Sequence, residues 1–104
     1  MIYALVNDLF FRSKIEATAR VQNKEVHFTS GASAIRNATL VLVDLEFARP
    51  EDLSLILKNN PLVQMVGFAS HKNAGAFEMA KHAGIHAMPR SLFTQKISDL
   101  LEDK

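Results

Sequence analysis

The stretch Ala38-Thr39-Leu40-Val41-Leu42-Val43-Asp44 lies near the middle of the chain and decides its fold. Its short, uniform run of apolar and β-branched residues predicts a strand that is buried on both faces, as in the centre of a parallel sheet. Asp44 follows where this strand leaves the core. Because open α/β sheets bind ligands at the carboxyl ends of their central strands, Asp44 is the first candidate for a functional residue.

The composition is that of an ordinary globular domain. The 104 residues are 48% hydrophobic and 22% charged, with a formal net charge of +1 and no cysteine. This length predicts one domain, residues 1–104. The nearly balanced charge gives no reason to expect nucleic acid or an anionic membrane as partner. The lack of cysteine excludes disulfides and thiolate catalysis and favours a cytoplasmic protein. No apolar run approaches the ~20 residues of a membrane span.

Strand-like and helix-like segments alternate along the whole chain. The expected strands are residues 2–6, 24–28, 38–44, 62–68 and 85–88. The expected helices are residues 9–22, 50–58, 73–82 and 92–102, with at most a turn or two of helix in 32–37. Such alternation predicts a parallel sheet with helices on both faces. Right-handed crossovers favour the flavodoxin-like strand order 2-1-3-4-5, with a shortened second helix.

In this topology, polar residues from several loops meet at one rim of the sheet, where the strands end. They are Asn7 and Asp8 after the first strand, Asp44 after the third, Ser70 and His71 after the fourth, and Arg90 after the fifth. Simpler structural roles also fit some of them. Asp44 suits a strand-end aspartate that caps a loop, and Asp8 suits the N-cap of the helix that follows it.

This arrangement resembles the receiver domains of bacterial response regulators, and the resemblance covers nearly the whole chain. In receivers the third strand ends in the phosphoacceptor aspartate, and Asp44 matches that position. Receivers hold magnesium with an acidic pair after the first strand, and Asn7-Asp8 matches this pair half-way. The resemblance therefore implies that Asp44 is a candidate phosphoacceptor, and that Asn7, Asp8 and Asp44 are candidate magnesium ligands.

The departures from the receiver pattern favour a degenerate site. Asn7 replaces one carboxylate, which lowers the expected affinity for magnesium. Met88-Pro89-Arg90-Ser91 stands in place of the receiver's Lys-Pro, so that the cation follows the proline and has a planar fork. Ala69-Ser70 reverses the receiver's order of hydroxyl and alanine. Ser70 and Arg90 are candidate contacts for an anion, although a salt bridge from Arg90 to Asp44 or Asp8 is the simpler role for the arginine.

Two stretches, residues 8–15 and residues 67–71 together with 89–93, resemble small stand-alone bacterial receiver-like proteins of unassigned function. The chain is therefore expected to be a receiver-like signalling or protein-interaction module rather than an enzyme. It would need no cofactor and would act through a protein partner or through self-association.

Two further residues carry structural expectations. Ser91 is the expected N-cap of the last helix. Phe47, on the loop after Asp44, would mark a contact patch if it is exposed.

Two alternatives use the same rim. The first is a functional phosphoacceptor response regulator, in which Asp44 is phosphorylated with Mg²⁺ held by Asn7 and Asp8. Ser70 and Arg90 would then contact the phosphoryl oxygens. The second is a small flavodoxin-like enzyme or binding protein that takes an anion or a nucleotide at the rim.

Overall fold

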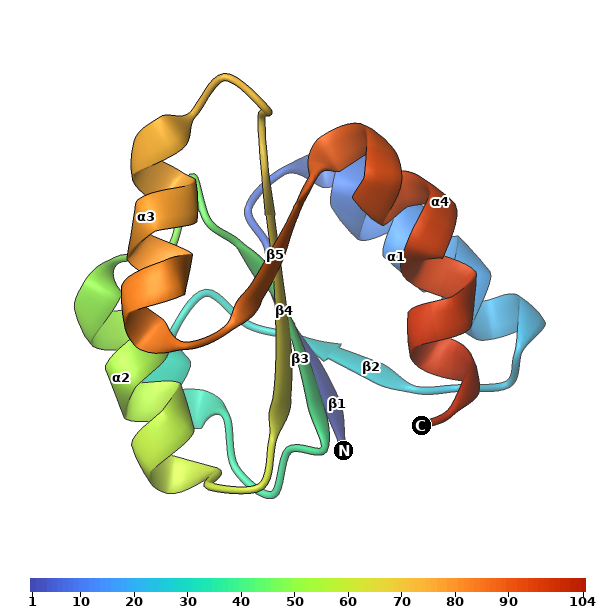
Figure 1. Ribbon diagram of the computed structural model, residues 1–104. Helices are drawn as coiled ribbons and strands as arrows, with labels where there is room; N and C mark the ends of the chain where they lie inside the picture. The colour runs from blue at the N-terminus through green and yellow to red at the C-terminus, as the bar shows by residue number, and fades with distance from the viewer.

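A five-stranded, fully parallel sheet forms the centre of the molecule (Figure 1). The computed structural model describes all residues, 1–104. The strands are β1 (Ile2–Leu5), β2 (Val26–Phe28), β3 (Leu40–Asp44), β4 (Gln64–Ala69) and β5 (His86–Pro89). Their spatial order is β2-β1-β3-β4-β5, which confirms the order expected from the sequence.

Helices cover both faces of this sheet. α1 (Leu9–Val21) and α4 (Arg90–Glu102) lie on one face, and α2 (Pro50–Asn59) and α3 (Ala74–Ala83) lie on the other (Figure 1). Between β2 and β3 there is only a short 3-10 helix, η1 (Ala32–Ala34), which confirms the expectation of a shortened second helix. The result is a three-layer α/β fold of the flavodoxin-like kind, as predicted. None of the helices combines the length and the apolar character needed to cross a membrane.

The central strand β3 supplies side chains to both cores of the molecule. It pairs with β1 on one side and with β4 on the other, and all its residues are buried. Leu40 and Leu42 pack toward α1 and α4, whereas Val41 and Val43 pack toward α2 and α3. Both faces of this strand are therefore covered, which is why its sequence shows no alternation of apolar and polar residues.

The sheet edge at β2 has the half-buried character predicted from its alternating sequence. All residues of β2 are half-buried, and the strand pairs only with β1.

At the opposite edge of the sheet, α4 begins at Arg90, immediately after β5. The prediction of Ser91 as the N-cap of α4 is wrong, because Pro89 occupies that position, with an extended backbone and no side-chain hydrogen bond. Arg90 therefore lies in the first turn of α4.

Candidate functional site

Asp44 is the last residue of β3 and is only 4% exposed. Its backbone oxygen accepts hydrogen bonds from the amides of Phe47, at 3.0 Å, and Ala48, at 2.9 Å. Its side-chain Oδ1 accepts a hydrogen bond of 3.0 Å from the amide of Glu46. Asp44 thus caps the turn that follows β3, and this turn fixes the direction of its carboxylate.

The surroundings of the Asp44 carboxyl raise its pKa. Burial raises the pKa of Asp44 above its ordinary value, since desolvation penalises the charged carboxylate. The hydrogen bond from Glu46 and the positive charge of Arg90 lower this pKa, and the negative charges of Glu46 and Asp8 raise it. The net direction is upward, so Asp44 is a weaker acid than an exposed aspartate.

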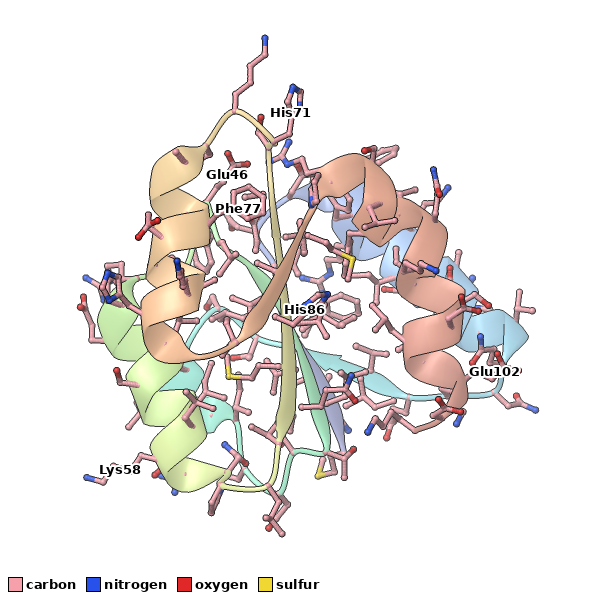
Figure 2. All side chains as sticks on the ribbon, in the orientation of Figure 1. Glu46, Lys58, His71, Phe77, His86 and Glu102 are labelled. Atoms are coloured by element: carbon pink, nitrogen blue, oxygen red, sulfur yellow. The ribbon has the colours of Figure 1, made fainter.

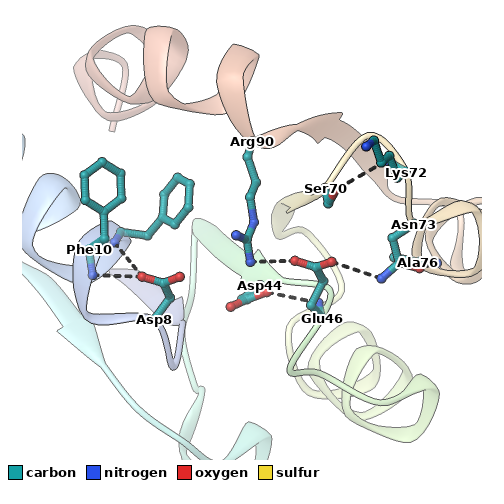
Figure 3. A network of polar contacts seen from close by, with 10 residues as sticks. Asp8, Phe10, Asp44, Glu46, Ser70, Lys72, Asn73, Ala76 and Arg90 are labelled. Carbon is teal, nitrogen blue, oxygen red and sulfur yellow. Dashed lines mark hydrogen bonds and ion pairs between the residues drawn. The ribbon is translucent and has the colours of Figure 1, made fainter.

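Glu46 links three elements at the rim (Figure 3). Its Oε1 forms an ion pair with the guanidinium of Arg90, from the first turn of α4. Its Oε2 accepts a hydrogen bond of 3.1 Å from the side-chain amide of Asn73, at the N-terminus of α3. The side chains of Arg90 and Glu46 are 39% and 26% exposed, respectively. We call Glu46, Arg90 and Asn73 the rim clasp.

Aromatic side chains lie beneath the rim clasp. The guanidinium carbon of Arg90 is 5.5 Å from the ring centroid of Phe11, a cation–π distance. Phe11, Phe68 and Phe93 pack together, with centroid separations of 4.7 Å for Phe11–Phe68 and 4.2 Å for Phe68–Phe93. The Nε of Arg90 is buried and has no hydrogen-bond partner. Arg90 is therefore held between an aromatic core and the carboxylates of the rim.

Asp8 lies on the other side of Arg90 from Glu46 in Figure 3. Its Oδ1 accepts hydrogen bonds from the amides of Phe10, at 2.8 Å, and Phe11, at 3.3 Å. This geometry confirms the predicted N-cap role of Asp8. Its negative charge also reaches Asp44. Asn7 precedes it as an exposed residue.

Ser70 and His71 follow β4 but take no part in the rim clasp. The Ser70 hydroxyl accepts a hydrogen bond of 3.3 Å from the amide of Lys72, and its carbonyl accepts one of 2.9 Å from the amide of Asn73. Asn73 itself caps α3, since its Oδ1 accepts a hydrogen bond of 3.0 Å from the amide of Ala76. His71 is exposed and points away from the fold (Figure 2). Ser70 therefore shapes the loop that delivers Asn73 to Glu46.

The structure corrects one expectation at the rim and adds one residue. Arg90 pairs with Glu46, not with Asp44 or Asp8 as the sequence suggested. Glu46 was not among the predicted site residues. The only sequence feature that could have pointed to it is its position, as a carboxylate two residues after Asp44. Phe47, in the same loop, is half-buried and packs against the core on the α2 and α3 face. Phe47 therefore does not stand out as an exposed contact patch.

The positive charge at the rim comes from the chain itself. The negative charges of Asp8 and Glu46 act on Asp44, but no group of three or more Asp, Glu or His side chains is arranged to hold a metal. One carboxylate oxygen of Asp8 already accepts the hydrogen bonds that cap α1. The positive charge next to Asp44 comes from Arg90.

Comparisons of the chain with protein-family models, with curated proteins and with solved structures find no match. The likeness to receiver domains thus stays a prediction. It rests on the strand order and on the position of Asp44 at the end of the central strand.

Proposed function

We propose that the chain is a receiver-like signalling or protein-interaction module in which the Arg90 guanidinium takes the place of a divalent cation beside Asp44. One observation supports this most strongly. Arg90 is ion-paired with Glu46 and acts electrostatically on Asp44, at the end of the central strand. A positive charge fixed to the chain replaces one that would otherwise come from solution.

Physical chemistry explains why such a rim is a poor phosphoacceptor. Phosphoryl transfer to a carboxylate needs an ionised nucleophile and positive charge that stabilises the transferred oxygens. Arg90 is already engaged by Glu46. A guanidinium also offers only hydrogen-bond donors, whereas magnesium offers coordination positions for oxygen. We expect the module to act through its surface.

A titration with Mg²⁺, followed by NMR on ¹⁵N-labelled protein, tests this proposal. The amide of Glu46 is the reporter, because it donates to Asp44. We expect no saturable shift of this amide in the wild type. Arg90→Ala should shift this amide more than the wild type does at the same Mg²⁺ concentration, since the carboxylates of Asp8, Asp44 and Glu46 lose their counter-charge. Arg36→Ala, which removes an exposed arginine elsewhere, should behave as the wild type.

A saturable Mg²⁺-dependent shift at Glu46 in the wild type would overturn the proposal. It would favour the alternative of a working phosphoacceptor, because a dication would then reach Asp44 despite Arg90. An Arg90→Ala variant that stays folded but responds to Mg²⁺ no more than the wild type would also count against the proposal, since Arg90 would not be what keeps the cation away from Asp44.

A further inference from the structure

Gly67 lies in the middle of β4, in a part of the strand that is buried from Met65 to Ala69. Glycine weakens the interior of a strand relative to alanine, and it often marks a place where another part of the chain approaches closely. A β-carbon at Gly67 would lie 2.7 Å from Cδ1 and 2.8 Å from Cγ of Leu45. The Leu45 side chain therefore fills the space that any larger residue at position 67 would need.

The other glycines of the chain have no such contact. A β-carbon at Gly31 or at Gly84 would meet no atom within 4 Å, and one at Gly75 would meet only Oδ1 of Asn73, at 3.7 Å. Gly84 has a different role, since it ends α3 with a positive φ of 75°. The close approach to a neighbouring side chain is thus particular to Gly67.

Leu45 connects this contact to the rim. It lies between Asp44 and Glu46 and is only 3% exposed. Its amide donates a hydrogen bond of 2.9 Å to the carbonyl of Phe68, and its side chain packs in the core beneath α2 and α3. An enclosed leucine has little room to move away from an added methyl group. A larger residue at position 67 would therefore displace the turn that follows Asp44.

Glu46 passes the position of this turn on to Arg90. Its carboxylate pairs with Arg90 and accepts a hydrogen bond from Asn73, and its amide donates to Asp44 (Figure 3). Hydrogen bonds of this kind weaken steeply when the distance or the angle departs from its preferred value. A displaced turn would therefore loosen the rim clasp.

We infer that Gly67 is a positioning residue for the rim clasp. Because Gly67 has no side chain, Leu45 can hold the turn after Asp44 against β4, and this contact keeps Glu46 where it pairs with Arg90. Gly67 itself makes no polar contact at the rim. The inference rests on the proposed function, since it names the residue that keeps the positive charge of Arg90 beside Asp44.

Hydrogen exchange of the Arg90 Nε–H group, measured by NMR at mildly acidic pH, tests this inference. The group is a direct reporter, because Nε is buried and has no hydrogen-bond partner. We expect Gly67→Ala to raise its exchange rate about tenfold, because Glu46 no longer holds the guanidinium. Glu46→Ala should raise the rate to a similar extent, since it removes the carboxylate of the ion pair.

Two double variants separate positioning from a loss of stability. In Gly67→Ala combined with Glu46→Ala, the rate should equal that of Glu46→Ala alone, because Gly67 acts through Glu46. In Gly67→Ala combined with Leu45→Ala, the rate should fall below that of Gly67→Ala alone. The second change removes the Cγ and Cδ atoms that the new methyl group would meet.

Gly31→Ala is the matched control, because its methyl group enters open space, and it should leave the rate at the wild-type value. The side-chain amide of Asn60, which is buried and donates to Ile35 and Ile56, reports on opening of the whole molecule. Its exchange should change less than that of Arg90 in every variant. If Gly67→Ala does not fold, Leu45→Ala alone carries the test, and it should also raise the Arg90 rate.

A wild-type rate in Gly67→Ala, or in Leu45→Ala where the first variant does not fold, would overturn the inference. So would an equal rise at Asn60, or additive effects of Gly67→Ala and Glu46→Ala. None of these measurements uses Mg²⁺. An Arg90 group that ignores Gly67→Ala would reject the positioning role and keep the proposed function, whereas a saturable Mg²⁺ shift at Glu46 in the wild type would reject the function alone.

Discussion

Glu46 controls the chemistry of the rim at the scale of single residues. Its amide orients the carboxylate of Asp44, and its own carboxylate holds Arg90 and Asn73. One residue therefore sets both the direction of Asp44 and the position of the positive charge beside it. Because the ion pair is partly exposed, its contribution to the free energy of unfolding should be small, about 1 kcal/mol or less. The main effect of the ion pair is to hold the positive charge of Arg90 near Asp44.

Asp44→Asn should make the protein more stable at neutral pH. The pKa of Asp44 is raised above 3.8 in the folded protein, mainly by burial. The folded state then binds more protons than the unfolded state between 3.8 and the folded-state pKa. The contribution of Asp44 to stability is therefore greatest at low pH and falls as the pH rises through the folded-state pKa. Asparagine has no such loss and still offers an oxygen to the Glu46 amide.

Urea unfolding of the wild type and Asp44→Asn, at acidic and at neutral pH, measures this effect. We expect the advantage of the variant to grow from acidic to neutral pH. An advantage that does not change with pH, or a variant that is less stable at neutral pH, would mean that burial does not penalise the Asp44 carboxylate.

Asn60 holds several elements together at the end of the molecule opposite the rim. It is 4% exposed and follows α2. Its Nδ2 donates to the carbonyls of Ile35, at 3.0 Å, and Ile56, at 2.9 Å, and its Oδ1 accepts from the amide of Ala38, at 3.0 Å. The segment that contains η1 is too short to form a full helix. Asn60 supplies hydrogen bonds that fix this segment between β2 and β3.

Asn60→Ala should lower the free energy of unfolding by about 2–4 kcal/mol, because it leaves buried backbone groups without partners. Equilibrium urea denaturation measures this loss. Asn59→Ala is the matched control at the neighbouring position, and it should change the stability by less than about 1 kcal/mol. Equal effects of the two substitutions would show that the hydrogen bonds of Asn60 do not stabilise η1.

The junction between β5 and α4 shows where sequence patterns mislead at the scale of elements. Serine is a favoured N-cap, which pointed to Ser91 as the start of α4. The helix instead begins at Arg90, because Pro89 serves both as the end of β5 and as the N-cap residue. Without a loop between strand and helix, the backbone of Arg90 is positioned by the sheet. The Arg90 side chain therefore extends to the rim from a backbone that the sheet holds in place.

At the scale of the whole molecule, hydrophobic patterns were enough to predict the fold. The uniform run of β3 and the alternation of β2 distinguished the centre of the sheet from its edge, and right-handed crossovers favoured the strand order that the structure shows. The side-chain pairs at the rim could not be predicted in this way. Several carboxylates lie within reach of Arg90, and the turn after Asp44 decides that Glu46 is its partner.

The central claim is that Asp44 has the position of a phosphoacceptor in a rim that does not perform the chemistry. Intact-mass spectrometry after incubation with a small phosphodonor and Mg²⁺ tests it most directly, with Asp44→Asn treated in parallel. We predict that the wild type and the variant both keep their unmodified masses. A stable mass increase of one phosphoryl group in the wild type, absent from Asp44→Asn, would contradict the account.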